Sequence, residues 1–100
     1  MPSLIVRLRG LPFTATELEI IEFLGNPQNP QIHFFETPTG KKTGEAFVTV
    51  QTEAEYQACI DRHKQFLGMR YVEVFASNEH QMISRLRREM RRRLHISEEK

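Results

Sequence analysis

The stretch from residue 42 to residue 50 constrains the fold of this chain most, because its side chains alternate strictly in character. In a β-strand, successive side chains point to opposite faces of the sheet. One face of this stretch is apolar, with Ala46, Val48 and Val50. The other face is mixed, with Glu45, Phe47 and Thr49. The pattern predicts a central strand in a sheet that is packed on one side and open on the other.

β-rich or alternating segments at residues 4–9, 32–36 and 70–75 predict three further strands. Between them, amphipathic segments predict two helices, over residues 14–24 and 52–63. Each helix opens with a capping-box pattern, Thr14 to Glu17 and Thr52 to Glu55. In the first helix we expect inward positions at Leu18, Ile20, Ile21 and Leu24. In the second they are expected at Tyr56, Cys59, Ile60 and His63.

The predicted element order is β-α-β-β-α-β, which is typical of the α+β, ferredoxin-like sandwich. Four strands would form one antiparallel sheet with both helices on one face. One hundred residues suit one domain, which we place at residues 1–78. Two segments are expected to be loops, residues 37–43 and residues 64–69.

A final helix is predicted over residues 79–96, within a basic C-terminal segment that spans residues 79–100. Residues 81–100 carry seven Lys or Arg against three Asp or Glu, whereas residues 1–80 carry seven against ten. An apolar stripe on this helix needs a cover: Met82, Ile83, Leu86, Met90 and Leu94. We expect the start of the helix to cap the open sheet face, and docking on another chain is the alternative. Charged side chains are expected opposite the stripe, at Arg85, Arg88 and Arg92.

Composition argues against several classes of function. Cys59 is the single cysteine, and the four histidines show no metal-ligand spacing, so neither a metal nor another cofactor is expected. No apolar run reaches the length of a membrane span, so no membrane partner is expected. Acylphosphatases share the β-α-β-β-α-β order, but residues 9–13 lack their Gly-rich phosphate loop. No other catalytic arrangement is evident. We therefore expect no enzyme and no small-molecule substrate.

Residues 42–49 approximate the RNP1 signature of RNA recognition motifs, K/R-G-F/Y-G/A-F-V-x-F/Y. In standard RNA recognition motifs, aromatic side chains of two central strands stack bases on the open face. Here two of those positions hold Arg7 and Glu45, and Phe47 alone remains aromatic. We predict an ion pair between Arg7 and Glu45, in the space where a base would stack. Either the sheet serves protein contact instead, or RNA is held elsewhere.

Two loops at one end of the predicted sheet offer a second surface for RNA. An Arg fork can hydrogen-bond guanine O6 and N7 while a neighbouring ring stacks on the base. The candidate RNA-binding residues are Arg9, Phe13, Lys64, Arg70 and Tyr71. For Phe13, the alternative is a core plug beneath the first helix. Secondary candidates for contact with RNA or a protein partner are Lys41, Lys42, Phe47, Arg85, Arg88 and Arg92.

Three runs, at residues 9–13, 43–48 and 67–75, resemble the quasi-RNA recognition motifs of the hnRNP F/H and epithelial splicing regulatory protein group. The resemblance implies loop-mediated binding of single-stranded, guanine-rich RNA in pre-mRNA splicing or RNA processing. It implies a nuclear location, with the cytoplasm as a further site. The family's loop Arg, aromatic, Arg and Tyr fall on Arg9, Phe13, Arg70 and Tyr71, and a further basic residue falls on Lys64. The alternative is a protein-interaction module of the same fold, with partners bound through the C-terminal helix.

Overall fold

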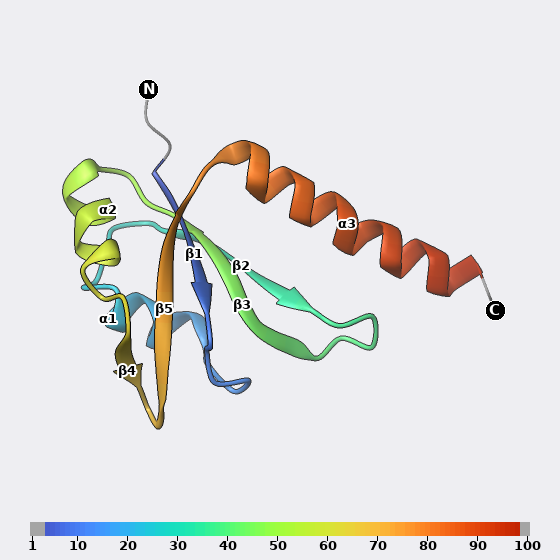
Figure 1. Cartoon of the computed structure of the whole chain (residues 1–100), viewed down its shortest axis with the longest axis horizontal. Helices are drawn as coiled ribbons and strands as arrows, with labels where there is room; N and C mark the ends of the chain where they lie inside the picture. The colour runs from blue at the N-terminus through green and yellow to red at the C-terminus, as the bar shows by residue number, and fades with distance from the viewer. Residues whose placement is uncertain (1–3, 99–100) are drawn as a thin grey trace.

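The computed structural model of the chain describes residues 4–98, and this range contains five strands and three helices. In chain order they are β1 (Ile5–Arg9), α1 (Glu17–Phe23), β2 (Gln31–Glu36), β3 (Lys42–Thr49), α2 (Glu53–Ile60), β4 (Gln65–Leu67), β5 (Arg70–Ser77) and α3 (Glu79–Glu98) (Figure 1). Every predicted strand and helix is present, and the α+β class is confirmed.

The strands form one antiparallel sheet in the order β2-β3-β1-β5-β4. β1 lies in the centre, where Arg7 is opposite Phe47 of β3 and Phe75 of β5. Helices α1 and α2 lie on one face of this sheet (Figure 1). This is the ferredoxin-like arrangement that the sequence predicts, extended by the short edge strand β4.

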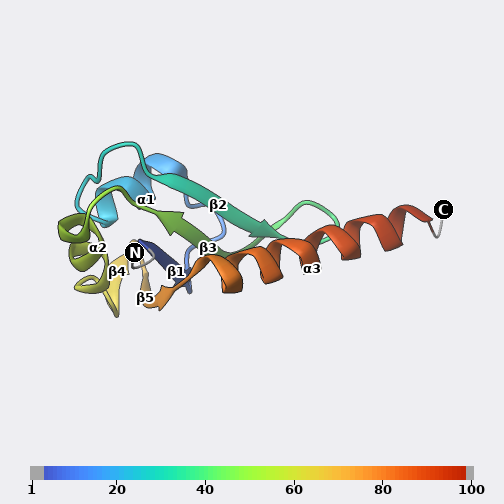
Figure 2. The same cartoon turned by 90° about the horizontal axis from the view of Figure 1, so that it is seen from above.

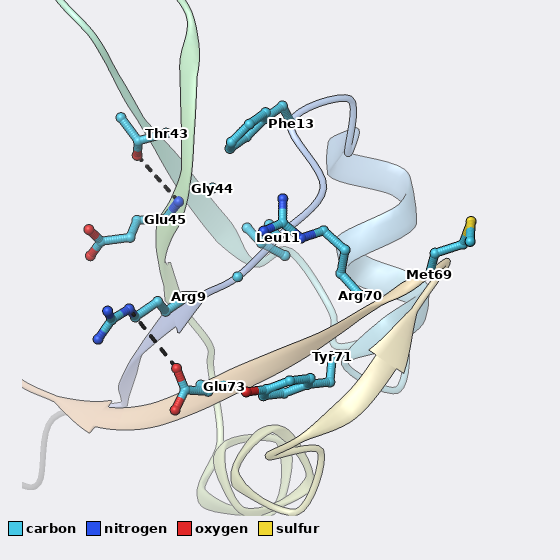
Figure 3. A pocket seen from close by; sticks show the side chains of 11 residues that line it. Arg9, Leu11, Phe13, Thr43, Gly44, Glu45, Met69, Arg70, Tyr71 and Glu73 are labelled. Atoms are coloured by element: carbon cyan, nitrogen blue, oxygen red, sulfur yellow. Dashed lines mark hydrogen bonds and ion pairs between the residues drawn. The ribbon is translucent and has the colours of Figure 1, made fainter.

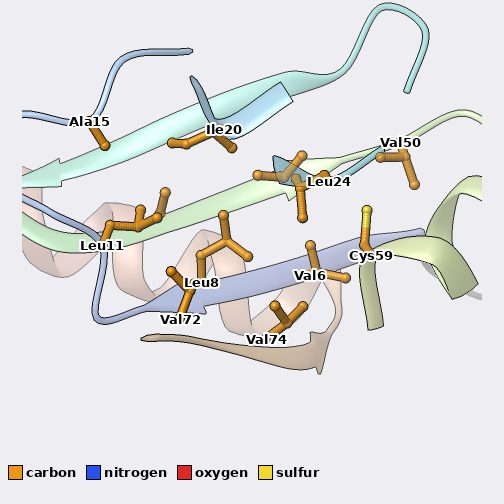
Figure 4. Packing of buried hydrophobic residues seen from close by; sticks show 12 residues of the cluster. Val6, Leu8, Leu11, Ala15, Ile20, Leu24, Val50, Cys59, Val72 and Val74 are labelled. Carbon is orange, nitrogen blue, oxygen red and sulfur yellow. The ribbon is translucent and has the colours of Figure 1, made fainter. Parts of the chain in front are cut away.

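The apolar faces of the strands pack against α1 and α2 in the main core (Figure 4). Its buried members are Val6, Leu8, Leu11, Ala15, Ile20, Leu24, Ala46, Val48, Val50, Cys59, Val72 and Val74. Burial raises the pKa of the Cys59 thiol to about 11, so this side chain stays protonated and fills the core as a small apolar group. The alternation of residues 42–50 therefore predicts correctly which face of the central strand packs in the core.

Helix α1 begins later than predicted. The Thr16 hydroxyl accepts the Glu19 N–H and the Glu19 carboxylate accepts the Thr16 N–H, so these two residues form the capping box. The predicted box at residues 14–17 is wrong, because two Thr-x-x-Glu patterns overlap in this stretch. With the observed start, Ile20 faces the core and Leu18, predicted to be inward, is exposed.

The segment predicted as a loop between α2 and the last strand contains β4. This strand pairs with the start of β5, with Leu67 opposite Arg70, so Gly68 and Met69 form a two-residue hairpin turn. Gly68 has a φ of +65°, as the first position of such a turn often requires. A three-residue strand is too short to show alternation, which is why the sequence pattern does not reveal it.

Helix α3 lies across the face of the sheet that the sequence predicts to be open (Figure 2). Met82 and Leu86, one helical turn apart, pack on a second apolar cluster formed by Ile5, Phe35 and Phe47. The expectation that the start of this helix caps the sheet is confirmed. Its C-terminal half runs on beyond the strands (Figures 1 and 2).

Candidate nucleic-acid interface

A charged network occupies the sheet position where an RNA recognition motif would stack a base. Arg7 Nη1 donates to Glu45 Oε2 at 3.3 Å, and Arg85 Nη2 from α3 donates to Glu45 Oε1 at 3.1 Å. Each guanidinium also lies over a ring, Arg7 at 4.7 Å from the Phe75 centroid and Arg85 at 5.0 Å from that of Phe35. The predicted Arg7–Glu45 ion pair is confirmed, and α3 adds a second arginine to it.

The remaining RNP1 aromatic, Phe47, lies under α3 and is 1% exposed. It packs edge-on against Phe35, with ring centroids 5.2 Å apart. Phe47 was a secondary candidate for RNA contact, but in this conformation no base can reach its ring. The charged network and the apolar side chains of α3 therefore cover the centre of the sheet.

The same network tunes the ionisation of Glu45. Partial burial would by itself raise the pKa of this carboxyl group, but the hydrogen bonds and charges of Arg85 and Arg7 outweigh it. The net effect is a pKa below the ordinary value of 4.5. Glu45 is therefore ionised at neutral pH and links β3 to both β1 and α3.

The three arginines predicted to lie opposite the apolar stripe of α3 do not point away from the sheet. Arg85, Arg88 and Arg92 line a hollow of about 150 Å³ between α3 and strands β2 and β3. Glu89 draws the same side of the helix toward β2, since its carboxylate accepts the Glu36 N–H at 3.0 Å. The prediction was wrong because the angle at which α3 crosses the sheet decides which side faces it.

A larger hollow, of about 500 Å³, lies at the rim of the sheet where the β1–α1 loop meets the β4–β5 hairpin (Figure 3). We call it the rim hollow. Its lining residues are Arg9, Gly10, Leu11, Phe13, Thr43, Gly44, Glu45, Met69, Arg70, Tyr71 and Glu73. Four of the five candidate RNA-binding residues are among them: Arg9, Phe13, Arg70 and Tyr71.

Two glycines let the β1–α1 loop approach the strands closely enough to form the rim hollow. Gly44 has a φ of +89°, and a Cβ there would lie 3.0 Å from the Leu11 carbonyl oxygen. Its own carbonyl accepts the Leu11 N–H at 3.0 Å. A Cβ on Gly10, also at a φ of +89°, would lie 2.9 Å from the Tyr71 carbonyl oxygen. Gly44 of the RNP1-like stretch is thus required by packing.

Phe13 stands at the mouth of the rim hollow. Phe13 is 61% exposed, so the alternative that it plugs the core is wrong, and the neighbouring Leu11 is buried in the core instead. The Arg70 guanidinium lies 5.4 Å from the Phe13 ring centroid, within the range of a cation–π contact. Tyr71 is 54% exposed. An exposed ring, a planar cation and a second ring are thus gathered around one opening.

Arg9 and Glu73 lie on neighbouring strands at the inner edge of the rim hollow (Figure 3). Arg9 Nε is 4.0 Å from Glu73 Oε1, and the Arg9 side chain is largely exposed. An exposed pair at this distance contributes about 0–1 kcal/mol, so either group can exchange its partner for a ligand at little cost. The rim hollow therefore presents guanidinium donors and a carboxylate acceptor side by side.

Comparison with known proteins identifies the family. The RRM domain family matches residues 6–92 of the chain. The chain belongs to the RRM domain family. RNA-binding protein 12 of Pongo abelii, Macaca mulatta and Homo sapiens is 36% identical to this RRM domain over 83 residues, which is 81% of the chain. The chain spans 9% of the length of these curated relatives.

Among solved structures, the qRRM2 domain of Glorund has a TM-score of 0.72 and 33% identity, covering 80% of this chain and 94% of that one. G-rich RNA sequence binding factor 1 from Homo sapiens has a TM-score of 0.70 and 27% identity, covering 83% of this chain and 88% of that one. The resemblance to quasi-RNA recognition motifs is thereby confirmed, and the RRM domain family is not an enzyme family.

The remaining candidates of this RRM domain lie outside the rim hollow. Lys64 precedes β4 and is exposed, but it does not line the hollow, because the β4–β5 pairing places it at the far end of the hairpin. Lys42 Nζ donates to the Ala15 carbonyl at 2.7 Å and lies 4.0 Å from the Phe34 ring centroid, so it is held on the helix side. Lys41 is exposed and lines a neighbouring hollow with Phe13.

Sequence reasoning did not single out Glu73 and Met69, which also line the rim hollow. Alternation along residues 70–75 places Glu73 on the same face as Tyr71, but only the pairing of β1 with β5 brings it beside Arg9. Within residues 4–98, no cluster of three or more His, Cys, Asp or Glu side chains is arranged to hold a metal ion. In the same range, no helix combines the length and the apolar character needed to cross a membrane.

Proposed function

We propose that this RRM domain binds single-stranded, guanine-rich RNA through the rim hollow, while the centre of its sheet stays closed. The observation that carries the proposal is the contrast in exposure between Phe47, at 1%, and Phe13, at 61%. Base stacking on an aromatic side chain contributes about 1–3 kcal/mol per base and requires an accessible ring. The accessible rings lie at the rim, beside Arg9 and Arg70.

The chemistry of the rim hollow favours guanine over the other bases. Guanine carries two acceptors, O6 and N7, on one edge, and its N1–H and N2–H₂ donors lie on the Watson–Crick edge. The guanidinium groups of Arg9 and Arg70 supply donors for the first edge, and the Glu73 carboxylate supplies an acceptor for the second. Both Glu45 oxygens already accept from arginines, which makes Glu73 the better acceptor.

The relatives add support of a different kind. G-rich RNA sequence binding factor 1 is named for binding G-rich RNA, and the RRM domain shares its fold over 83% of the chain. We extend that preference to this chain on the strength of the rim hollow. A role in pre-mRNA splicing or RNA processing and a nuclear location belong to the same proposal, and imaging of the fluorescently tagged protein in cells tests the location.

Titration by fluorescence anisotropy tests the binding site. A labelled RNA containing a run of guanines is compared with adenine and uridine runs of equal length at one fixed salt concentration. We expect tightest binding to the guanine run, and a loss of roughly 20-fold or more in Arg9→Ala/Arg70→Ala, because each bidentate Arg–guanine contact contributes about 1–3 kcal/mol.

The control for charge is Arg87→Ala/Arg91→Ala, which removes the same charge from exposed positions of α3. We expect this variant to bind within about threefold of the wild type, since it changes only long-range attraction. Equal losses in the two double variants, or no preference among the three RNA sequences, would overturn the proposal.

Protein docking through α3 is the second candidate function. Ile83 and Met90 lie seven residues apart on this helix and remain exposed, because the contact with the sheet uses Met82 and Leu86. Two exposed apolar side chains on one helix face suit a partner helix. If no RNA binds at moderate salt, and Ile83→Ala/Met90→Ala abolishes capture of a protein partner, this function takes the place of the first.

A further inference from the structure

Phe66 is an exposed aromatic side chain that neither the sequence motifs nor the rim hollow accounts for. It lies in the middle of β4 and is 69% exposed. Single exposed apolar residues are common and by themselves indicate no site. The position of Phe66 relative to Tyr71 and Lys64 is what calls for an explanation.

The Phe66 ring is the direct neighbour of the Tyr71 ring. The two residues are paired across β4 and β5, so their side chains lie on the same face of the hairpin. Their ring centroids are 6.4 Å apart with an interplanar angle of 75°. Tyr71 lines the rim hollow and Phe66 lies on its outer side, on the edge strand. The aromatic surface of the rim therefore continues past the rim hollow by one ring.

A cation immediately precedes the strand that carries this extra ring. Lys64, two residues before Phe66, is exposed and makes no ion pair among residues whose side chains are described. Its backbone is fixed in the left-handed region, with a φ of +65°, and its N–H donates to the Val72 carbonyl at 2.7 Å. An exposed ring with an exposed lysine two residues away along the chain suits a nucleotide, because the base can stack and the phosphate is anionic.

We infer that Phe66 stacks the base of a nucleotide flanking the guanine run, next to Tyr71, and that Lys64 contacts the phosphate of that nucleotide. The inference rests on the proposed function, because the RNA reaches Phe66 only after it has passed through the rim hollow. Stacking on Phe66 does not read a base edge, so this position accepts any base. It adds length to the binding site, and the guanine preference comes from the rim hollow alone.

The test separates the flanking base from the guanine run. Three RNAs are titrated by anisotropy: a minimal guanine run, the same run with one uridine added at each end, and the same run with an abasic ribose phosphate at each end. We expect wild-type protein to bind the uridine-extended RNA about five- to tenfold more tightly than the abasic-extended RNA. Phe66→Ala removes this difference and leaves the minimal run unaffected, whereas Phe66→Tyr preserves it.

Lys64→Gln is expected to weaken the binding of both extended RNAs alike. It should also lower the slope of log affinity against log salt concentration by about 0.7 for them, as the loss of one phosphate contact predicts. The matched apolar control is Leu18→Ala, which removes an equally exposed side chain from α1 on the other side of the sheet. This control is expected to bind all three RNAs as the wild type does. Thermal unfolding of Phe66→Ala verifies that the hairpin is intact.

Two results would overturn the inference while leaving the proposed function standing. In the first, Phe66→Ala binds all three RNAs like the wild type while Arg9→Ala/Arg70→Ala binds none. In the second, Phe66→Ala weakens the binding of the minimal run as much as that of the extended RNAs, which would show that Phe66 merely supports Tyr71. Absence of binding to any of these RNAs by the wild type would remove both proposals.

Discussion

The centre of the sheet and the rim hollow are two surfaces of one RRM domain built from similar residue types. Each has an Arg–Glu pair between neighbouring strands, Arg7–Glu45 in the centre and Arg9–Glu73 at the rim. The central pair is shorter, is joined by Arg85 and lies beside α3. The rim pair is looser and open to solvent. The comparison teaches that the environment of such a pair decides whether it closes a surface or leaves it available.

The residues of the RNP1-like stretch divide in the same way. Ala46 and Val48 pack in the core and Gly44 lets the β1–α1 loop approach, so these residues serve the fold. Phe47 has become part of a second apolar cluster beneath α3. The exposed ring nearest to this stretch is that of Phe13 in the β1–α1 loop, whose atoms lie close to Gly44. Residues that match the RNP1 signature can thus serve the fold without forming an exposed stacking surface.

The largest expected effect is a difference in folding stability between alanine variants of Phe47 and Phe13. Phe47→Ala empties a buried site between the sheet and α3 and is expected to lower the free energy of unfolding by about 3–5 kcal/mol. Phe13→Ala removes an exposed ring and is expected to change it by less than about 0.5 kcal/mol. Urea denaturation followed by circular dichroism measures both. Similar values for the two variants would contradict the assignment of one surface as closed and the other as open.

The same pair of positions is expected to show the reverse order in RNA binding. Phe13→Ala is expected to weaken the binding of guanine-run RNA by about 1–3 kcal/mol, roughly 5- to 150-fold in affinity, because it removes the stacking ring. Phe47→Leu keeps the buried site filled and is expected to bind within about twofold of the wild type. Isothermal titration calorimetry measures both affinities. A larger loss in Phe47→Leu than in Phe13→Ala would move the binding site back to the sheet.

A smaller effect concerns the carboxylate at the rim. Replacing a bound guanine by inosine removes the N2 amino group, and with it one hydrogen bond to Glu73 that we estimate at about 1.5 kcal/mol, or roughly tenfold in affinity. In Glu73→Gln the penalty for inosine is expected to shrink to about threefold, because the acceptor is no longer charged. Competition titrations with the two RNAs measure this ratio. An unchanged ratio would mean that Glu73 does not contact that amino group.

The smallest effect is a pH dependence at the sheet centre. The pKa of Glu45 is lower in the folded state than its ordinary value of 4.5, so the unfolded chain binds more protons over the window between these two values. The stability that Glu45 contributes is therefore complete above pH 4.5 and is lost as pH falls through the folded pKa. Denaturation midpoints compared between wild type and Glu45→Gln should converge as the pH is lowered below 4.5. A difference that stays constant with pH would contradict the role of the charge.

The sequence is sufficient to predict features that depend on strict alternation or on a match between neighbouring strands. The core face of the central strand and the Arg7–Glu45 pair are of this kind, and so is the meeting of Phe13 with Arg70 at one end of the sheet. The first follows from alternation, and the other two follow from which strands and loops are neighbours in this fold. The β-α-β-β-α-β pattern predicts the fold that makes them neighbours.

Other features depend on geometry that no local pattern contains. The direction of Arg85 is set by the angle at which α3 crosses the sheet. The place of Lys64 is set by β4, a strand of three residues. The exposure of Leu18 follows from which of two overlapping capping boxes forms. In each case the local sequence does not settle the outcome, because packing between elements decides it.

A backbone NMR titration with guanine-run RNA tests most directly whether this domain binds RNA at the rim hollow. We predict the largest shift changes at the amides of Arg9, Phe13, Arg70 and Tyr71, with small changes at Phe47 and Thr49 and along the first two turns of α3. The largest changes at Phe47, Thr49 and Phe75, together with release of α3 from the sheet, would contradict the account.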